Sequence, residues 1–229
     1  FFRDSGVVLD AGSGLHRLMG RISTTHLDIV LSHAHLDHCM GLTFLIDVMH
    51  VHPLSRIRVF GEPEKLAAIR SHLFHPAIFP ATLEVEWCDV DVQGVTRLGG
   101  RDEIAMRCFP QKHPGGSIAI SLVDEAGKKV VYATDTEGDL GSGFADFAGD
   151  GDLLMHECNF SDEYADLAMK TGHTSLSRLE AVAKNCNPSK LLVTHLNPLE
   201  MAEPIDPQPL EKTLGCPVII AEDRLEVAF

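Results

Sequence analysis

The sequence predicts an α/β protein built from two β-sheets that are covered by helices. Short apolar runs of strand length alternate along the chain with longer amphipathic segments of helix length. Several apolar runs end in polar, histidine-containing sequence, as expected where buried strands deliver residues to the edge of a sheet. No linker-like, low-complexity or repeated segment interrupts the 229 residues, which favours a single domain over the whole chain, 1–229.

Strands and helices are expected in the following order. The strands are placed at residues 7–9, 27–31, 56–60, 83–87, 104–109, 117–123, 129–133, 153–156, 191–194 and 218–221. The helices are placed at 41–49, 62–72, 162–170 and 175–185. The last helix carries a clear apolar stripe, and Thr174 or Ser175 is expected to cap its N-terminus. Gly127 marks a hairpin turn between two of the strands.

Composition limits the class of protein. The formal net charge of −14 argues against a long polyanion as partner, and no apolar run is long enough to cross a bilayer. The six cysteines lack CxxC spacing and stand mostly in apolar contexts, so we expect buried, reduced thiols and a cytoplasmic protein. The chain begins at Phe1 without a methionine, which leaves open a missing N-terminal strand or a removed signal peptide.

The most informative stretch is His33-Ala34-His35-Leu36-Asp37-His38, directly after the apolar run 27–31. Imidazole and carboxylate are the usual ligands of zinc, iron and manganese, and the stretch has no thiolate to suggest a structural zinc finger. In an extended backbone His33, His35 and Asp37 point to one side, so the two histidines could hold one ion while Asp37 and His38 turn toward a second. The stretch therefore predicts a metal site.

This stretch resembles the HxHxDH signature of the metallo-β-lactamase superfamily, and four further motifs follow in the order typical of that family. The chain has VVLDAGSG around Asp10, KHPGGS around His113, YATDTEG around Asp135 and LLVTHLNP around His195. The resemblance covers about residues 7–227. It implies an αββα sandwich, with two mixed sheets flanked by helices and metal-binding loops along one edge.

The resemblance also implies a binuclear metal site and assigns its ligands. One metal would be held by His33, His35 and His113, and the other by Asp37, His38 and His195, with Asp135 bridging the two. Two divalent ions are expected, with zinc as the first choice and manganese or iron open. Asp10 is expected behind the ligands, where it would orient a ligand or the turn at 12–14.

Two more motifs point to one branch of the family. Gly172-His173-Thr174-Ser175 stands directly before a helix, and a helix N-terminus offers N–H donors to a phosphate oxygen. Both this motif and LLMHECNF at 153–160 resemble ribonuclease Z and related small phosphodiesterases, including the cyclic-phosphate enzyme of phosphonate breakdown. The resemblance gives His173 a role in phosphodiester cleavage, and Glu157 is expected behind the ligands, where it would orient a ligand histidine; the role of His156 stays open.

The implied activity is hydrolysis of a phosphodiester by a hydroxide shared between the two metals, with Asp37, Asp135 and His173 as catalytic residues. Ribonuclease Z carries a long basic arm between its third ligand histidine and its bridging aspartate. Here 21 residues separate His113 from Asp135 and they read as one hairpin. This difference disfavours transfer-RNA processing and favours a small or cyclic, nucleotide-like phosphodiester. A homodimer is possible on the same resemblance.

Two other classes of function were considered. A carbon-ester hydrolase, acting on a lactone, thioester or β-lactam, would use the same metal core without needing His173. A scaffold that binds metal without catalysis is disfavoured by the complete set of ligands. The remaining histidines lack supporting spacing and are expected to be structural or solvated: His16, His26, His50, His52, His72 and His75.

Overall fold

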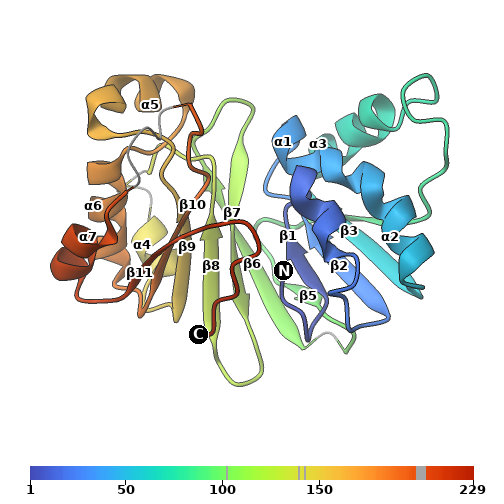
Figure 1. Cartoon of the computed structure of the whole chain (residues 1–229), viewed down its shortest axis with the longest axis horizontal. Coiled ribbons are helices and arrows are strands. Elements are labelled where there is room, and N and C mark those ends of the chain that lie inside the picture. Colours follow the sequence, from blue (N-terminus) through green and yellow to red (C-terminus); the bar gives the residue numbers. More distant parts are fainter. Residues whose placement is uncertain (102, 139, 142, 200–204) are drawn as a thin grey trace. The chain divides into compact units, whose positions relative to one another are not determined.

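The structure, a computed structural model, describes residues 1–101, 103–138, 140–141, 143–199 and 205–229. The chain divides into two compact units, Phe1–Met106 and Arg107–Phe229. Figure 1 shows strands and flanking helices in both units. The α/β prediction with two sheets flanked by helices is confirmed.

The first unit contains a four-stranded sheet in the order β1-β2-β3-β4, and each neighbouring pair is parallel. Its strands are β1 (Val7–Leu9), β2 (His26–Val30), β3 (Arg56–Gly61) and β4 (Glu86–Asp89). A short strand, β5 (Thr96–Leu98), pairs antiparallel with the first residues of β6 (Ile104–Gln111). Since consecutive strands are parallel, the chain must cross back over the sheet between them, and the helices of the unit lie in these crossovers.

Helices cover the first sheet and bury its apolar side chains. They are η1 (Ser13–Leu18), α1 (Leu36–Cys39), η2 (Met40–Phe44), α2 (Leu45–Val51), α3 (Pro63–Ala68) and the π-turn η3 (Ile69–Leu73). Leu42, Leu45 and Val48 from these helices share one core with Leu27 and Ile29 from β2. This core fixes the C-terminal end of β2, where the histidine-rich stretch begins.

A buried ion pair fastens the sheet of the first unit. Asp28 on β2 is fully buried and accepts two hydrogen bonds of 2.7 Å from the guanidinium of Arg58 on β3. The same carboxylate accepts the backbone N–H of Gly99 at 2.7 Å. Because its charge is paired and hydrogen-bonded, Asp28 can be buried without a large desolvation penalty.

The second unit contains a mixed sheet in the order β11-β10-β9-β8-β7-β6. Its further strands are β7 (Ser117–Val123), β8 (Lys129–Ala133), β9 (Leu153–Glu157), β10 (Leu191–Thr194) and β11 (Val218–Ile220). The strands β7 and β8 form an antiparallel hairpin, and β8, β9, β10 and β11 run parallel. Gly127 lies in the hairpin turn with φ of +82°, as predicted.

Helices α4 (Phe144–Ala148), α5 (Ala165–Thr171), α6 (Leu176–Cys186) and α7 (Pro207–Leu214) belong to the second unit, with the short turn η4 (Asp162–Tyr164) before α5. In Figure 1, α4, α6 and α7 lie beside β9, β10 and β11. Leu179, Val182 and Ala183 on α6 pack in one core with Leu154 on β9 and Val193 on β10. The predicted apolar stripe of this helix is therefore the face that covers the sheet.

The structure corrects several predicted elements. The helix expected at 41–49 is wrong in extent, because helical structure begins at Leu36 and passes through α1, η2 and α2. The strand expected at 83–87 lies at Glu86–Asp89, and the first sheet is parallel rather than mixed in its pairings. The strand β5 and the helices η1, α4 and α7 were not predicted.

In the part of the chain that the structure describes, none of the helices combines the length and the apolar character that a membrane crossing requires. All six cysteines are free thiols, and four of them are buried: Cys39, Cys108, Cys158 and Cys186. Burial raises the pKa of the Cys39 and Cys186 thiols to about 11, so both are protonated at neutral pH.

Candidate metal centre

The first unit presents its histidines from a turn that follows β2 and continues into α1. The rings of His33 and His35 lie edge to face with centroids 4.4 Å apart, and their ligand nitrogens approach within 4.8 Å. Asp37 and His38 lie on α1, and the Nε2 atom of His38 is 3.3 Å from the Asp37 carboxylate. The predicted pairs are therefore present, but a helical turn rather than an extended strand separates them.

Asp10, at the end of β1, fixes this turn. Its carboxylate accepts the backbone N–H of Ser32 at 2.7 Å, the Ser32 hydroxyl at 2.8 Å and the Nδ1–H of His38 at 2.8 Å. A histidine that donates through Nδ1 carries its lone pair on Nε2, the atom that a metal would bind. Asp10 thus acts on His38, one of the two roles expected for it, and holds it in the tautomer of a metal ligand.

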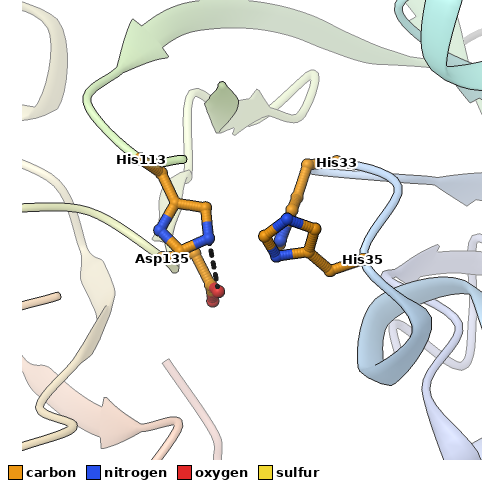
Figure 2. A group of neighbouring side chains, drawn as sticks. All are labelled: His33, His35, His113 and Asp135. Carbon is orange, nitrogen blue, oxygen red and sulfur yellow. Dashed lines mark ion pairs between the residues drawn. The ribbon is translucent and has the colours of Figure 1, made fainter. Parts of the chain in front are cut away.

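The second unit gathers three separate segments around Asp135. The Nε2 atom of His113 is 3.3 Å from Asp135 Oδ2, and the Nε2 atom of His195 is 3.2 Å from Oδ1. Figure 2 shows the ring of His113 facing the Asp135 carboxylate, with the ion pair between them drawn as a dashed line. Each oxygen of one carboxylate therefore faces a different imidazole within this unit, as a bridging ligand must.

Gly172, the first residue of the GHTS motif, orients the ring of His113 through a hydrogen bond. Its carbonyl accepts the Nδ1–H of His113 at 2.8 Å, so His113 also carries its lone pair on Nε2. A Cβ atom at residue 172 would lie 2.4 Å from the Pro114 ring, and the backbone there has φ of +77°. Glycine is needed here because both the close approach and the left-handed backbone exclude a side chain.

Three of the predicted site residues have strained backbones. Asp10, Asp135 and His195 have φ of +56°, +50° and +52°, a region that residues other than glycine seldom occupy. Such strain persists only where surrounding contacts hold it, and it is concentrated at functional sites. The strain supports a functional role for these three positions, and sequence patterns do not reveal it.

Glu157, which is buried, pairs with the partly buried His173 in the second unit. Glu157 at the end of β9 is fully buried and accepts the backbone N–H of Thr136 at 2.6 Å and of Thr174 at 3.2 Å. The Nδ1 atom of His173 lies 3.1 Å from Glu157 Oε1. Glu157 was expected to orient a ligand histidine, but the histidine that it contacts is His173, which is not among the predicted ligands.

His173 stands beside both imidazoles of its unit. Its ring centroid is 5.1 Å from that of His113 and 5.5 Å from that of His195, onto which it stacks at 18°. A histidine in this place, with its Nδ1 committed to a carboxylate, can present Nε2 to a group bound between its neighbours. The three rings together make one continuous imidazole surface.

The start of α6 differs from the phosphate-binding N-terminus that was predicted. Ser175 is its N-cap, but the Asp162 carboxylate accepts the Ser177 N–H at 2.8 Å, and Glu157 takes the Thr174 N–H. The Asp162 carboxylate thus takes one donor of this terminus, Glu157 takes an N–H just before it, and the charge of both would repel a phosphate oxygen. The expected contribution of the helix N-terminus is therefore not favoured.

Several contacts of the site escaped the sequence patterns. The side-chain amide of Asn159 lies 3.0 Å from His195 Nδ1 and donates to the His195 carbonyl at 3.1 Å. The Thr134 hydroxyl donates to Asp135 Oδ1 at 2.8 Å. Both residues stand inside motifs quoted above, Thr134 in YATDTEG and Asn159 in LLMHECNF, and that position was the only signal of their roles. In contrast, His26 and His52 contact backbone carbonyls in the first unit, in keeping with structural roles.

The donor set fits divalent metal ions. His38 and His113 both present Nε2 and use Nδ1 on an oxygen, the arrangement usual in histidine ligands of metals. Asp135 and Asp37 add carboxylate oxygens, and no thiolate takes part. Imidazole with carboxylate suits zinc, manganese and iron, so the ligands do not select among these three.

Comparison with known proteins identifies the family of the chain. Residues 6–196 match the family model described as "Beta-lactamase superfamily domain". The ribonuclease Z of Archaeoglobus fulgidus is 31% identical in an alignment that covers 100% of this chain and 90% of the relative. The chain belongs to the metallo-β-lactamase superfamily. Within it the chain stands in the ribonuclease Z-like branch, and the ribonuclease Z of Haloferax volcanii is 23% identical over 97% of this chain and 86% of its own length.

Solved structures share the metallo-β-lactamase fold. Human tRNase Z, short form, superposes with a TM-score of 0.73 at 21% identity and covers 97% of this chain and 87% of its own. A diphosphatase from the PhnP family gives a TM-score of 0.72 at 17% identity over 97% of this chain and 79% of its own. Membership of this superfamily, with the histidine and aspartate groups described above, makes the chain a metal-dependent hydrolase.

Proposed function

We propose that this metallo-β-lactamase family hydrolase is a phosphodiesterase that acts on a small or cyclic phosphodiester with two divalent metal ions, most simply zinc. In this proposal His33, His35 and His113 hold one ion, and a second set holds the other. The second set is Asp37, His38 and His195, and Asp135 bridges the two ions.

One observation carries the proposal. His173 is held by Glu157 directly beside His113 and His195, whose Nε2 atoms face the two oxygens of Asp135. Hydrolysis of a phosphodiester needs a proton donor for the departing alkoxide, because an alkoxide is a poor leaving group at neutral pH. A carboxylate-oriented histidine next to the ligand group supplies that donor.

When bound, two divalent ions lower the pKa of water to about 7 and neutralise charge on a phosphate oxygen. The side chains of the protein position the site and supply the proton. Asp135 sets the spacing between the His113 and His195 sides of the site. Glu157 keeps the Nδ1–H of His173 engaged, so that a proton on Nε2 can pass to the leaving oxygen.

Two observations bear on the size of the substrate. Between His113 and Asp135 the chain forms only the β7–β8 hairpin with a turn closed by Asp124 and Lys128. This favours a small substrate because no extended arm is available there to hold a transfer RNA. The names ribonuclease Z and tRNase Z among the relatives favour RNA instead, so precursor transfer RNA belongs among the substrates tested.

The deciding experiment is a substrate panel with zinc- and manganese-loaded protein. An aryl phosphodiester, 2′,3′-cyclic nucleotides and a precursor transfer RNA are compared with a lactone and a thioester. Each is run with wild type, His173→Ala and His50→Ala, the last replacing an exposed histidine as a matched control. We expect turnover of the cyclic nucleotides that falls about 10²–10⁴-fold in His173→Ala alone, the usual contribution of general acid–base catalysis, and a smaller fall for the aryl phosphodiester, whose leaving group needs no proton.

Other outcomes of the panel assign other functions. Turnover confined to the lactone or thioester and unaffected by His173→Ala would identify a carbon-ester hydrolase. Cleavage of precursor transfer RNA with no turnover of the small phosphodiesters would overturn the proposed substrate class. A protein that binds metal but turns over nothing would be the scaffold considered above.

Asp135→Ala tests the bridging role. Removing the carboxylate that both imidazoles face should lower turnover by more than the roughly 10–100-fold typical of residues that only support ligands. The metal content of the purified protein, measured by plasma mass spectrometry, should fall from two equivalents. Wild-type activity with full metal loading would contradict the assignment of Asp135.

A further inference from the structure

The carboxylate of Asp135 is held by its own neighbour in the sequence. Thr134, directly after β8, is fully buried and its hydroxyl donates to Asp135 Oδ1 at 2.8 Å. In an extended strand the side chains of adjacent residues point to opposite faces and could not meet in this way. They meet here because Asp135 has a φ of +50°, which turns its side chain back toward Thr134.

A second hydroxyl holds the turned backbone in place. Ser117, the first residue of β7, is buried and donates to the Asp135 carbonyl at 2.7 Å. The left-handed conformation of an aspartate is energetically unfavourable and has to be maintained by such contacts. Ser117 thus fixes the main chain of Asp135, and Thr134 fixes the rotation of its carboxylate.

The oxygen that Thr134 contacts is the one that faces His195. Asp135 Oδ1 lies 3.2 Å from His195 Nε2, whereas Oδ2 lies 3.3 Å from His113 Nε2. A carboxylate that bridges two ions must keep its plane fixed, since rotation about its bond to Cβ moves both oxygens away from their imidazoles. A hydroxyl donor on Oδ1 resists that rotation and also leaves a lone pair of this oxygen available.

We propose that Thr134 is a positioning residue that orients the Asp135 carboxylate and thereby maintains binding of the metal ion on the His195 side. The inference rests on the proposed binuclear site and adds to it a residue outside the ligand set. Residues that hydrogen-bond to metal ligands typically contribute about 10–100-fold to metal affinity.

The test measures metal affinity directly, with Thr134→Val, which replaces the hydroxyl by a methyl group of similar size. Metal-free protein is titrated with Zn²⁺ in competition with a chromophoric chelator. We expect wild type to bind two equivalents and Thr134→Val to bind one of them about 10–100-fold more weakly. Thr134→Ser keeps the hydroxyl and should restore the affinity. Ser121→Ala, which removes a buried hydroxyl opposite Val131 on the same hairpin, is the matched control and should bind like wild type.

A double-mutant cycle locates the effect. If Thr134 acts through Oδ1 and the His195 side, Thr134→Val should add little loss of affinity in a His195→Ala background. Two equivalents bound with wild-type affinity by Thr134→Val would overturn the inference and leave the proposed function standing. Failure of wild type itself to bind two equivalents would overturn the proposed function instead. Thermal unfolding of the metal-free variants shows whether any loss of affinity comes from misfolding.

Discussion

In the described part of each unit an acid holds a histidine through its Nδ1 atom, Asp10 in the first unit and Glu157 in the second, and the two acids do so in different ways. Asp10 in the first unit collects donors from Ser32 and His38, which lie within seven residues of each other. Glu157 in the second unit collects donors from Thr136, His173 and Thr174, which come from two segments far apart in the sequence. Asp10 therefore shapes one local turn, whereas Glu157 joins two loops to the end of β9.

The histidines that they hold differ as well. His38 belongs to the predicted ligands, and His173 does not. On the proposed function, the same contact, a carboxylate on Nδ1, would serve metal binding in one unit and proton transfer in the other. Loss of Asp10 and loss of Glu157 should then have separable effects.

The largest effect is expected for Asp10→Asn. Asparagine tolerates the left-handed backbone of this position, so the substitution changes the acceptor without adding strain. If the asparagine amide NH₂ faces His38, it donates to Nδ1, so the ring takes the tautomer with its proton on Nε2 and cannot bind a metal through that atom. Metal affinity, measured by chelator competition, should fall about 10–100-fold, and turnover should fall with it. Unchanged affinity would show that His38 does not depend on Asp10.

A more selective effect, on turnover without loss of metal, is expected for Glu157→Gln. The metal content should stay at the wild-type level because Glu157 contacts no predicted ligand in the hydrogen bonds described above. Turnover should fall about 10–100-fold for phosphodiesters whose alcohol is a poor leaving group. It should fall less for aryl esters, whose leaving groups need no proton. The comparison of the two ester classes by kcat is the measurement. An equal loss for both classes, or a loss of metal, would contradict the role of Glu157.

The smallest effect concerns stability and His156. Its imidazole is fully buried, which lowers the pKa below its usual 6.5, and its Nδ1–H donates to the Glu157 carbonyl at 2.8 Å. Below pH 6.5 the imidazole of His156 is protonated in the unfolded chain but stays neutral in the folded protein. The free energy of unfolding therefore falls as the pH drops through that value.

His156→Asn keeps a donor for the Glu157 carbonyl and removes the titration. Chemical denaturation of metal-free protein at pH 7 and pH 5.5 is the measurement. Wild type should lose more stability than the variant between these values, by at most about 1.4 kcal/mol per pH unit. Equal losses in the two proteins would show that His156 titrates normally in the fold.

Sequence patterns predicted most of the fold because its strands are short, apolar and separated by clear turns. The strands at Val7–Leu9, Ser117–Val123, Lys129–Ala133 and Leu191–Thr194 have the predicted bounds. The elements that were missed are short, such as β5 and α4, and depend on tertiary pairing rather than on local pattern. The helix α7 did carry a signal, since Asp206 caps it and Pro207 begins it.

The candidate ligands were also predictable, because metal binding demands particular side chains at particular places. The supporting contacts were not, because hydroxyl and amide donors such as Thr134, Ser117 and Asn159 occur everywhere in sequences. Only the three-dimensional path of the chain shows which of them reach a ligand. The strained backbones of Asp10, Asp135 and His195 are invisible to sequence patterns for the same reason.

The β7–β8 hairpin has a consequence for engineering. His113 precedes β7 and Asp135 follows β8, so both lie at one end of the hairpin, and the turn of residues 124–128 lies at the other end (Figure 1). The seven residues of β7 place the turn roughly 20 Å from that end. Exposed turns accept inserted sequence readily. A substrate-binding domain could therefore be inserted at this turn to change which substrates the enzyme binds, while His113 and Asp135 keep their positions.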